Sequence, residues 1–586
     1  MKEYTLVTTA LEETWPDDNQ PVLFLGEWCR LYPRKQRWEK MDAEVLAYPW
    51  DDRAKLYENY QYLRDLFEQL LSDLSSELNK IHGVDHSLRY WRIMLGPWLM
   101  NFLPIVFERC SCLEKAISSY TIENIIVLEN ESLDNIPVDM LHFTALQGED
   151  RWNEFLYFSI LKLLGFNKSI IKKDAELKTD GVKKEVRNGR SVLSMLKSTV
   201  INISSILAAK NDYFIVNPYL SRKDNVELDL KLFQFPGRHP SGKYGEVNPD
   251  ISYRKWKLPS SNDETAFEKI VKELIPLQLP QAYLEGYKKL YSKINNLRWT
   301  KKPKLIWTSN SYYLDDIFKM WAAERVEEGV PLVIGQHGGH YGQGLFSFPE
   351  YHELMICDRY LSWGWGHADD KVVPLGMFKR NNLQKKKKAS KKHSLFVISG
   401  APRYSGTVIS MPMAGQVSKY LDDQLEFYGK LSDNVSKNVI IRLYPHDYEL
   451  SQYDRWKDTF PNSTIDGGEL TFDKALRKAD LVIAGWNTTT YLESMSSDIP
   501  TVIFWNPEYF ELREEASILF ESLKKVGIYH TNPVEAANHV IKIWNDIEGW
   551  WNLPDVVAAK EEFLNKYALS CDHLTNKLKS ILKSVG

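Results

Sequence analysis

The stretch "DLVIAGWNTTTYLESMSSDIPTVIFW", residues 480–505, holds two short apolar runs on either side of a polar segment. Runs such as "LVIA" and "TVIF" are typical of strands that are buried on both faces of a parallel sheet. The segment between them, "TTTYLESMSSD", begins with residue types that open helices and has the length of a helix. A strand, a helix and a strand in this order predict a parallel α/β sheet.

The same alternation continues upstream. "SLFVISG", "MAGQVSKYLDDQLEFYGKL", "NVIIRLYP" and "TFDKALRKA" predict a strand, a helix, a strand and a helix. Earlier, "PKLIWTS", "LDDIFKMWAAERVEEG" and "VPLVIGQHGG" repeat the pattern, and "YTLVTTA", "PVLFLGEW", "IENIIVL" and "YFIVN" are further strand candidates. We therefore predict an α/β fold of two Rossmann-like domains with a cleft between them.

A chain of 586 residues is longer than one hydrophobic core supports. The run "KKKKASKK", residues 385–392, has six lysines in eight positions and is typical of a solvated linker. It predicts an α/β domain with helical insertions at 1–388 and a Rossmann-like domain at 389–586. The charged segment 168–190 is predicted to be an exposed insertion, and 233–256, rich in Gly and Pro, a long loop.

Composition narrows the class of protein. The net charge of −4 argues against a nucleic-acid partner. Five cysteines, an odd number, fit a reduced cytoplasmic protein. The N-terminus has no apolar signal segment, and the longest apolar run, residues 93–107, is broken by Pro97 and Pro104 and is too short to span a bilayer. We expect this run to be a buried core segment, and peripheral contact with a membrane stays open.

Polar clusters follow four of the expected strands, where parallel sheets bind their ligands. The clusters are "GQHGGHYG" at 335–342, "SGAPRYSG" at 399–406, "RLYPHDY" at 442–448 and "GWNTTTYLES" at 485–494.

The last cluster suits a phosphate group. Asn487 and Thr488 to Thr490 open a helix, and free helix N–H groups together with hydroxyls bind anions. Glu493, one turn further, can accept hydrogen bonds from a ribose. The alternative is that Thr488, Thr489 and Thr490 only cap the helix.

The other three clusters contain arginines, histidines, and glycines whose backbone a ligand can approach closely. Arg442 and His446 can meet a phosphate or a base edge, with an exposed loop as the alternative. We assign Gly338, Gly400 and Arg403 to the same ligand-binding set.

His337 is the predicted general base, because it follows a strand directly and an imidazole moves protons near neutral pH. The alternative is that His337 only makes hydrogen bonds within its turn, and His340 either orients it or stays exposed. No Asp, Glu or His set at metal-ligand spacing accompanies these histidines, so no metal site is predicted. In the N-terminal part, Thr8, Glu12, Glu13 and Glu27 follow strand ends; Glu13 is a substitute base, and surface caps are the alternative.

These residues carry a resemblance. The "HGG" loop, "YPHD" and "ADLVIAGWNTTTYLE" resemble the C-terminal half of GT-B glycosyltransferases, above all capsule polysaccharide, sialyl- and glycerophosphate-transferases that use cytidine nucleotides. There an "HG" loop supplies a catalytic histidine, a second histidine binds the nucleotide, and a Ser/Thr-rich helix start holds its phosphate. This chain has Pro445-His446 instead of His-Pro and Asn-Thr-Thr-Thr instead of a serine pair. "DGGE", residues 466–469, loosely resembles the acidic base motif of some sialyltransferases and makes Asp466 a third catalytic candidate.

The opening "LVTTALEETW…VLFLGEWCRLY" resembles a family of surface-carbohydrate transferases named after a leptospiral member. This second resemblance covers the whole chain. The resemblances imply a metal-independent glycosyltransferase that uses a nucleotide sugar as co-substrate and no other cofactor, with the acceptor on the N-terminal domain and the nucleotide on the C-terminal one. The implied donor is a CMP-activated nonulosonic acid, and the acceptor is a glycan, lipid-linked or protein. The alternatives are a nucleotide-sugar 2-epimerase and a non-catalytic glycan-binding or assembly protein.

Overall fold

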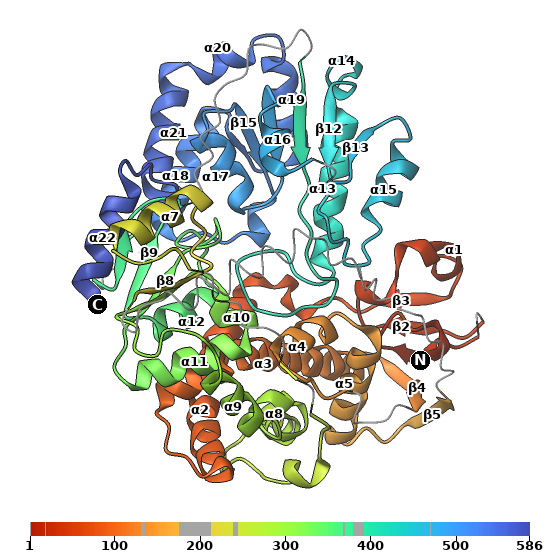
Figure 1. Cartoon of the computed structure of the whole chain (residues 1–586). Helices are drawn as coiled ribbons and strands as arrows, with labels where there is room; N and C mark the ends of the chain where they lie inside the picture. Colours follow the sequence, from red (N-terminus) through yellow and green to blue (C-terminus); the bar gives the residue numbers. More distant parts are fainter. Residues whose placement is uncertain are drawn as a thin grey trace, which may run out of the picture.

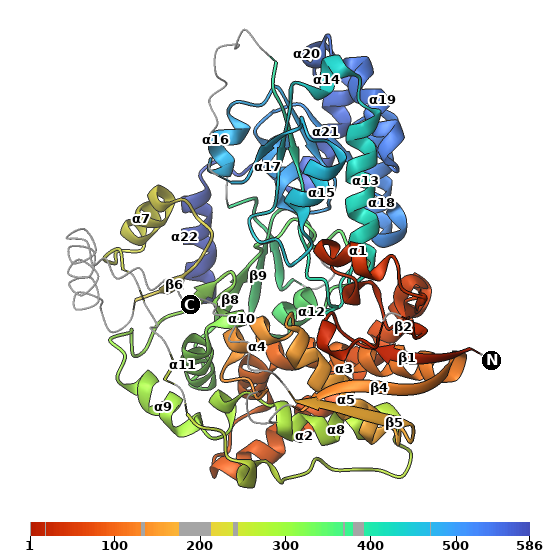
Figure 2. The same ribbon diagram turned by 90° about the vertical axis from the view of Figure 1, so that its right-hand side faces the viewer.

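The structure is a computed structural model, which describes residues 2–17, 19–129, 135–174, 212–237, 239, 244–245, 247–366, 370–378, 392–468 and 470–586. The described residues form three sheets, all of whose strand pairs are parallel, with helices between them (Figures 1 and 2).

The third sheet contains the stretch that predicted the fold. Its strand order is β13-β12-β11-β14-β15-β16. Val397, the last residue of β11, pairs with Arg442 at the end of β12 and with Ala484 at the end of β14, so the polar clusters begin at one edge. The strands are β11 (Ser394–Val397), β12 (Val439–Arg442), β13 (Thr464–Asp466), β14 (Leu481–Ala484), β15 (Thr501–Phe504) and β16 (Tyr529–His530). Its helices are α13 (Gln416–Lys430), α14 (Asp433–Ser436), α15 (Gln452–Thr459), α16 (Phe472–Leu476), α17 (Thr489–Ser496), α18 (Glu514–Lys525), α19 (Pro533–Ile543), α20 (Ile547–Trp551) and α21 (Pro554–Tyr567), with the 3-10 turn η7 (Pro507–Tyr509).

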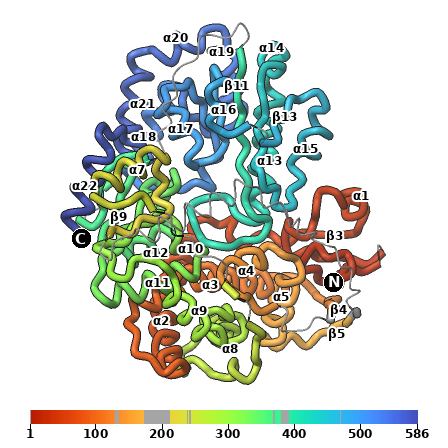
Figure 3. The backbone as a smooth tube through the Cα atoms, in the orientation of Figure 1, coloured from red at the N-terminus to blue at the C-terminus, as the bar shows by residue number. Residues whose placement is uncertain are grey.

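The second sheet has the order β10-β9-β8-β7-β6. The last helix of the chain, α22 (Leu574–Val585), returns to it: Leu578 and Leu582 pack with Trp307 and Leu361, and the C-terminus lies beside this sheet (Figure 3). The strands are β6 (Phe214–Val216), β7 (Ile306–Thr308), β8 (Leu332–Gly335), β9 (Arg359–Ser362) and β10 (Val372–Pro374). The other helices are α7 (Arg222–Lys231), α8 (Ala266–Gln278), α9 (Tyr287–Asn295), α10 (Ser311–Leu314), α11 (Asp316–Glu327) and α12 (Phe348–Ile356), with the 3-10 turns η5 (Ile251–Arg254) and η6 (Gln281–Tyr283).

The first sheet is a separate parallel sheet of order β3-β2-β1-β4-β5. β5 begins the segment that was predicted to be an exposed insertion. Ser169, Ile171 and Lys172 are exposed, as predicted, but Ser169–Asp174 are no insertion, because they pair with β4 as an edge strand, where lysines are common. Most of the rest of that segment lies outside the described residues. The strands are β1 (Glu3–Val7), β2 (Val22–Phe24), β3 (Ala43–Val45), β4 (Thr121–Glu129) and β5 (Ser169–Asp174). The helices are α1 (Lys35–Trp38), α2 (Arg53–His82), α3 (Leu88–Ser119), α4 (Met140–Leu146) and α5 (Asp150–Leu163), with the 3-10 turns η1 (Glu12–Thr14), η2 (Glu27–Cys29), η3 (Tyr32–Arg34) and η4 (Pro49–Asp51).

The long helix α3 joins the first and second sheets, since it contacts α2, α5, α11 and α12. It contains the apolar run 93–107, which is buried almost throughout, as predicted. Pro97 and Pro104 lie inside the helix, and the Asn101 side chain donates a hydrogen bond of 2.6 Å to the carbonyl of Pro97. No helix among the described residues is long and apolar enough to cross a membrane.

The α/β class is confirmed: the second and third sheets are parallel, as predicted, and a further parallel sheet, the first, is added. The lysine-rich run that suggested the boundary at 388/389 lies, except for Lys392, outside the described residues. The division into two domains therefore stays a prediction, and its N-terminal part carries two sheets.

Candidate active site between the second and third sheets

The glycine-rich loop after β8 contacts the start of α17 main chain to main chain. A Cβ atom added to Gly339 would lie 2.6 Å from the carbonyl carbon and oxygen of Thr488 and 2.8 Å from the nitrogen of Thr489. Any side chain at this position would collide with backbone that cannot rotate away. Position 339 therefore requires a glycine, because the backbone at the start of α17, a helix of the third sheet, lies so close to it.

Four backbone hydrogen bonds hold the following residues, 343–348, against the third sheet's loops. The amides of Phe348 and Ser410 donate to the carbonyls of Val408 (3.1 Å) and Phe346 (3.1 Å). The amides of Leu345 and Arg513 donate to the carbonyls of Glu511 (2.9 Å) and Gln343 (2.9 Å). The two sheets are thus joined by regular main-chain pairing at the site.

Polar side chains reinforce this contact. Nε2 of Gln343 donates to the carbonyl of Gly339 at 2.7 Å. The Tyr491 hydroxyl, on α17, lies 2.9 Å from the amide oxygens of both Gln343 and Asn487. Asn487, a predicted ligand-binding residue, is buried and is fixed by this network.

His337 lies at the start of the loop with 24% of its side chain exposed. Its Nε2 is 3.4 Å from the Tyr341 hydroxyl, and its Nδ1 is 3.9 Å from Oε1 of Glu353. Burial lowers the pKa of His337 to about 4, although a backbone hydrogen bond with Ser309 opposes this shift. The imidazole is therefore neutral at pH 7, which is the form that accepts a proton.

Glu353, on α12, is a residue that sequence reasoning missed. Its side chain has no exposed surface, and its Oε1 accepts hydrogen bonds from the hydroxyls of Tyr341 (2.6 Å) and Tyr312. Burial raises the pKa of Glu353 to about 8. Its segment, "FPEYHELMI", has the apolar pattern of an ordinary packed helix, so no signal in the sequence marks it.

His340 is the second histidine of the loop. Its ring packs on Tyr341 with centroids 4.4 Å apart, and burial lowers its pKa to about 3. A Cβ on Gly338 would lie 3.0 Å from the Tyr341 ring and 3.2 Å from the His340 ring, so Gly338 makes room for these two side chains.

The helix α17 begins without a side-chain cap. Thr488 is its N-cap residue and makes no capping hydrogen bond, which argues against a mere capping role for this threonine. Thr488, Thr489 and Thr490 are half-buried at the helix start, and Glu493 is buried. Uncapped N–H groups of a first helical turn form a site suited to a phosphate.

Arg403 lies between the first and third sheets and is engaged by protein groups. Its guanidinium donates to Asp150 at 2.8 and 2.9 Å, to Glu449 at 3.0 Å and to the carbonyl of Trp28 at 2.8 Å. The side chain is 5% exposed. These contacts give Arg403 a structural role, while its predicted contact with a ligand stays a prediction.

Arg442 and Asp466 lie at the ends of neighbouring strands and pair with each other. Nη1 of Arg442 is 2.6 Å from Oδ2 of Asp466, and Nη2 donates to the carbonyl of Leu470 at 2.8 Å. The carboxylate of Asp466 is thus engaged by a cation of the protein, and its predicted role as a base stays a prediction. Glu469 lies outside the described residues.

His446 is exposed, and its ring meets that of Tyr448 edge-on with centroids 4.3 Å apart. Tyr444 stacks on Tyr448, and a Cβ on Gly400 would lie 3.0 Å from the Tyr444 ring. The loops after β11 and β12 are thus side by side, as the predicted ligand site requires.

The N-terminal candidates belong to the first sheet. Thr8 is buried, and its carbonyl accepts a hydrogen bond of 2.9 Å from the Trp28 indole. Glu13 is exposed. Glu12 pairs with Arg34 and Arg37, and Glu27 with Arg30. A Cβ on Gly415 would lie 3.2 Å from Glu27, which places the Glu27 turn against the start of α13.

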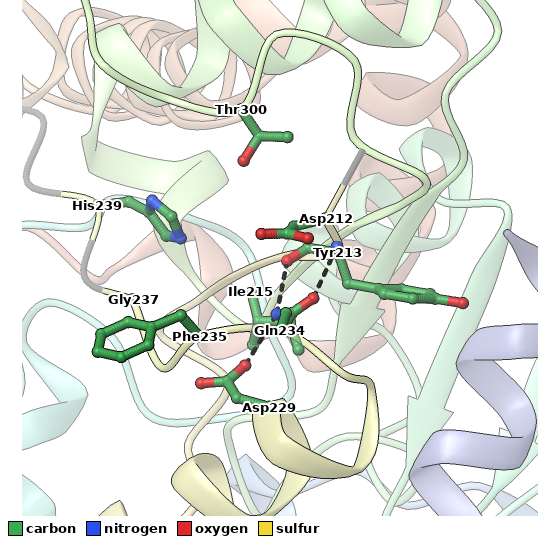
Figure 4. Close-up of a pocket in the computed structure, with 9 residues that line it drawn as sticks. All are labelled: Asp212, Tyr213, Ile215, Asp229, Gln234, Phe235, Gly237, His239 and Thr300. Atoms are coloured by element: carbon green, nitrogen blue, oxygen red, sulfur yellow. Dashed lines mark hydrogen bonds between the residues drawn. The ribbon is translucent and has the colours of Figure 1, made fainter. Parts of the chain in front are cut away.

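A small cavity of about 10 Å³ lies elsewhere, before the start of β6 (Figure 4). The Gln234 side chain bonds the backbone of Tyr213 and Oδ1 of Asp229 beside it. Tyr213 precedes β6, so the cavity lies at the amino ends of the strands of the second sheet. His337 lies at their carboxyl ends. Among the described residues, no group of three or more His, Cys, Asp or Glu side chains is arranged to hold a metal ion.

The fold and site define an α/β protein in which a buried histidine loop of one parallel sheet meets a helix start of another. Residues 4–582 match the LIC12162 family transferase, and the chain belongs to this family. It is therefore a transferase by family. Comparison with curated proteins found no match.

Among solved structures, the chain is similar to MurG of Acinetobacter baumannii, with 15% identity, a TM-score of 0.30 and coverage of 51% of this chain and 78% of that one. It is also similar to the wall teichoic acid polymerase TagF, with 10% identity, a TM-score of 0.32 and coverage of 67% and 96%.

Proposed function

We propose that the protein is a glycosyltransferase that moves a sugar from a nucleotide-activated donor to a glycan, lipid-linked or protein acceptor. One observation carries the proposal: the loop of His337 touches the start of α17 at Gly339 and Thr488. In the loop that makes this contact, the neutral imidazole of His337 is the proposed base. The uncapped N–H groups at the start of α17 are the proposed phosphate site. Membership of a transferase family supports group transfer in general.

In the proposed reaction, His337 takes the proton of the acceptor hydroxyl as that oxygen bonds to the sugar. The bond between sugar and phosphate breaks, and its electron pair leaves with the phosphate. The N–H groups and hydroxyls at Thr488 to Thr490 stabilise the charge that develops there. In this scheme no metal or further cofactor takes part.

The donor is proposed to be a CMP-activated sugar, with a nonulosonic acid as the transferred group. This part rests on the resemblance of "HGG", "YPHD" and "GWNTTT" to transferases that use cytidine nucleotides. Arg442, His446, Gly400 and Glu493 are the proposed contacts of the nucleotide, since they surround the loops at the carboxyl edge of the third sheet.

We further propose that the protein meets its acceptor at an anionic membrane surface. Phe233 is 85% exposed and Leu230 61% exposed, at the end of α7, which lies beside α22 (Figure 2). The ammonium groups of Lys579 and Lys583 lie 5.6 and 5.7 Å from the centre of the Phe233 ring. An apolar ring between two cations suits lipid headgroups of negative charge.

Turnover of nucleotide sugars with and without acceptors tests the function. A thermal-shift screen with cytidine, uridine, guanosine and thymidine nucleotides first identifies the donor. Transfer should require both substrates. Consumption of the nucleotide sugar without acceptor would favour the 2-epimerase instead. A wild-type protein that binds glycans but turns over no nucleotide sugar, and whose glycan binding is unchanged in His337→Ala, would favour the non-catalytic protein.

Sedimentation with vesicles tests the membrane surface. Binding is expected to vesicles that contain phosphatidylglycerol but not to pure phosphatidylcholine, and to weaken in Phe233→Ser and in the double variant Lys579→Glu/Lys583→Glu. Leu553→Ser, at a residue that is 51% exposed elsewhere on the surface, is the matched control. Equal binding by all variants, or no binding at all, would overturn this part.

A further inference from the structure

The carboxyl group of Glu353 lies 3.9 Å from Nδ1 of His337 and is surrounded by tyrosine side chains. Its Oε1 accepts a hydrogen bond of 2.6 Å from the Tyr341 hydroxyl and another from that of Tyr312. Tyr360, on β9, faces the same carboxyl. A carboxyl group without exposed surface is costly to bury, so a site that keeps one calls for an explanation.

Tyr341 connects this carboxyl to the imidazole. Because its proton is directed at Glu353, its oxygen presents lone pairs to Nε2 of His337, 3.4 Å away. Oε1 of Glu353 is itself 3.9 Å from Nδ1, which is shielded from solvent. Nε2 therefore faces the Tyr341 hydroxyl, and Nδ1 lies on the shielded side of the ring toward Glu353; the ring also has a hydrogen bond with the backbone of Ser309.

We propose that Glu353 is a positioning residue for proton transfer at His337: through Tyr341 it orients the imidazole, and as a carboxylate it stabilises the imidazolium. The inference rests on the proposed function. A half-turn of the ring about its bond to Cβ exchanges Nδ1 with Cδ2 and Nε2 with Cε1. In the turned ring, one nitrogen stays against the carboxyl–phenol pair while the other is directed away from it.

The outward nitrogen takes the proton of the acceptor hydroxyl, and the electron pair of that O–H bond becomes available for the new bond to the sugar. The inward N–H then carries positive charge toward Glu353 and Tyr341. The leaving phosphate keeps the electron pair of the broken bond.

The proposed stabilisation of the His337 imidazolium depends on pH, because Glu353 provides it only as a carboxylate. The groups that face it are His337 and Tyr341 from the loop, Tyr312 from α10, Tyr360 from β9, and Glu350 on its own helix. Burial raises the pKa of Glu353 to about 8; Glu350 adds to the shift and the three phenols oppose it. Below that pH the carboxyl is neutral. Above it the carboxylate attracts the imidazolium, so turnover per folded molecule should rise as the pH increases through about 8.

The variant Glu353→Gln tests the proposal, because it keeps the shape and removes the charge. Turnover at pH 8.5 is expected to fall by about 10–100-fold, the range known for groups that hold the second ring nitrogen of a metal-ligating histidine. The rise with pH should vanish, while nucleotide affinity stays unchanged. Tyr341→Phe should lose turnover similarly. Tyr312→Phe is the matched control, since this phenol also bonds Glu353 but packs on His352, and it should lose less.

Histidine NMR gives a readout that needs no turnover. The ring signals of His337 should shift between pH 7 and 9 in the wild-type protein as Glu353 ionises, and should stay constant in Glu353→Gln. Equal pH responses of the two proteins, or wild-type turnover and pH profile in Glu353→Gln, would overturn the inference. If His337→Ala also keeps full turnover, the proposed base is wrong as well; if it is inactive, only the role of Glu353 fails.

Discussion

Gly339→Ala tests whether the direct contact of the two sheets builds the site. The added Cβ would lie 2.6 Å from the carbonyl carbon and oxygen of Thr488, whereas ordinary contacts begin at 3.4 Å. The loop and the start of α17 must therefore move apart by about 0.8 Å, and overpacking of this kind typically costs about 1–3 kcal/mol of unfolding free energy. A misplacement of about 1 Å between reacting groups can cost about 10²-fold in rate.

Urea unfolding, followed by tryptophan fluorescence, measures the first effect, and turnover per folded molecule measures the second. Gly344→Ala is the matched control in the same loop, because its nearest neighbours would be Cβ and Oγ of Ser410 at 3.3 and 3.7 Å, close to the 3.4 Å at which ordinary contacts begin. We expect the control to change both quantities little. Wild-type stability and turnover in Gly339→Ala would refute the reasoning.

Three further predictions concern individual side chains. His337→Ala should lower turnover by about 10²–10⁴-fold with nucleotide affinity intact, and His340→Ala should lower it less; equal turnover per folded molecule would show that His337 only stabilises its turn. Thr489→Val should weaken nucleotide binding by about 1–3 kcal/mol in calorimetry, the cost of a missing hydrogen-bond partner; unchanged affinity would exclude this hydroxyl from the site. Arg403→Gln should lower the free energy of unfolding by about 3–5 kcal/mol, because it leaves Asp150 without its buried cation; a fully stable variant would leave ligand binding as the remaining role.

Part of the candidate site was predictable because it depends on local order along the chain. The strand ends at Gly335, Val397, Arg442 and Ala484 follow from short apolar runs. The parallel third sheet places the last three at one edge, whereas Gly335 ends a strand of the second sheet. The glycine at 339 could be recognised as a point of close approach. Its partner could not, since Thr488 lies in another sheet and no local pattern relates the two.

Glu353 shows the opposite case. A glutamate in an amphipathic helix is normally exposed, and only the positions of Tyr312 and Tyr341, contributed by other segments, turn it into a buried hydrogen-bond acceptor. Its raised pKa is a property of that enclosure and not of any motif. The same holds for Arg403, whose carboxylate partners Asp150 and Glu449 come from distant parts of the chain.

The loop after β11, residues 398–415, contacts parts of all three sheets at this site. Arg403 ties the loop to Asp150 of the first sheet's helices, and Ser410 pairs with Phe346 beside the second sheet. Met411, in the same loop, accepts a hydrogen bond of 3.3 Å from the Trp486 indole, two residues before Thr488. We therefore expect a displacement of the first sheet to reach, through this loop, both halves of the candidate site, the histidine loop and the helix start. Because the acceptor is proposed to bind at the first sheet, its binding and the alignment of His337 with the donor phosphate should depend on each other.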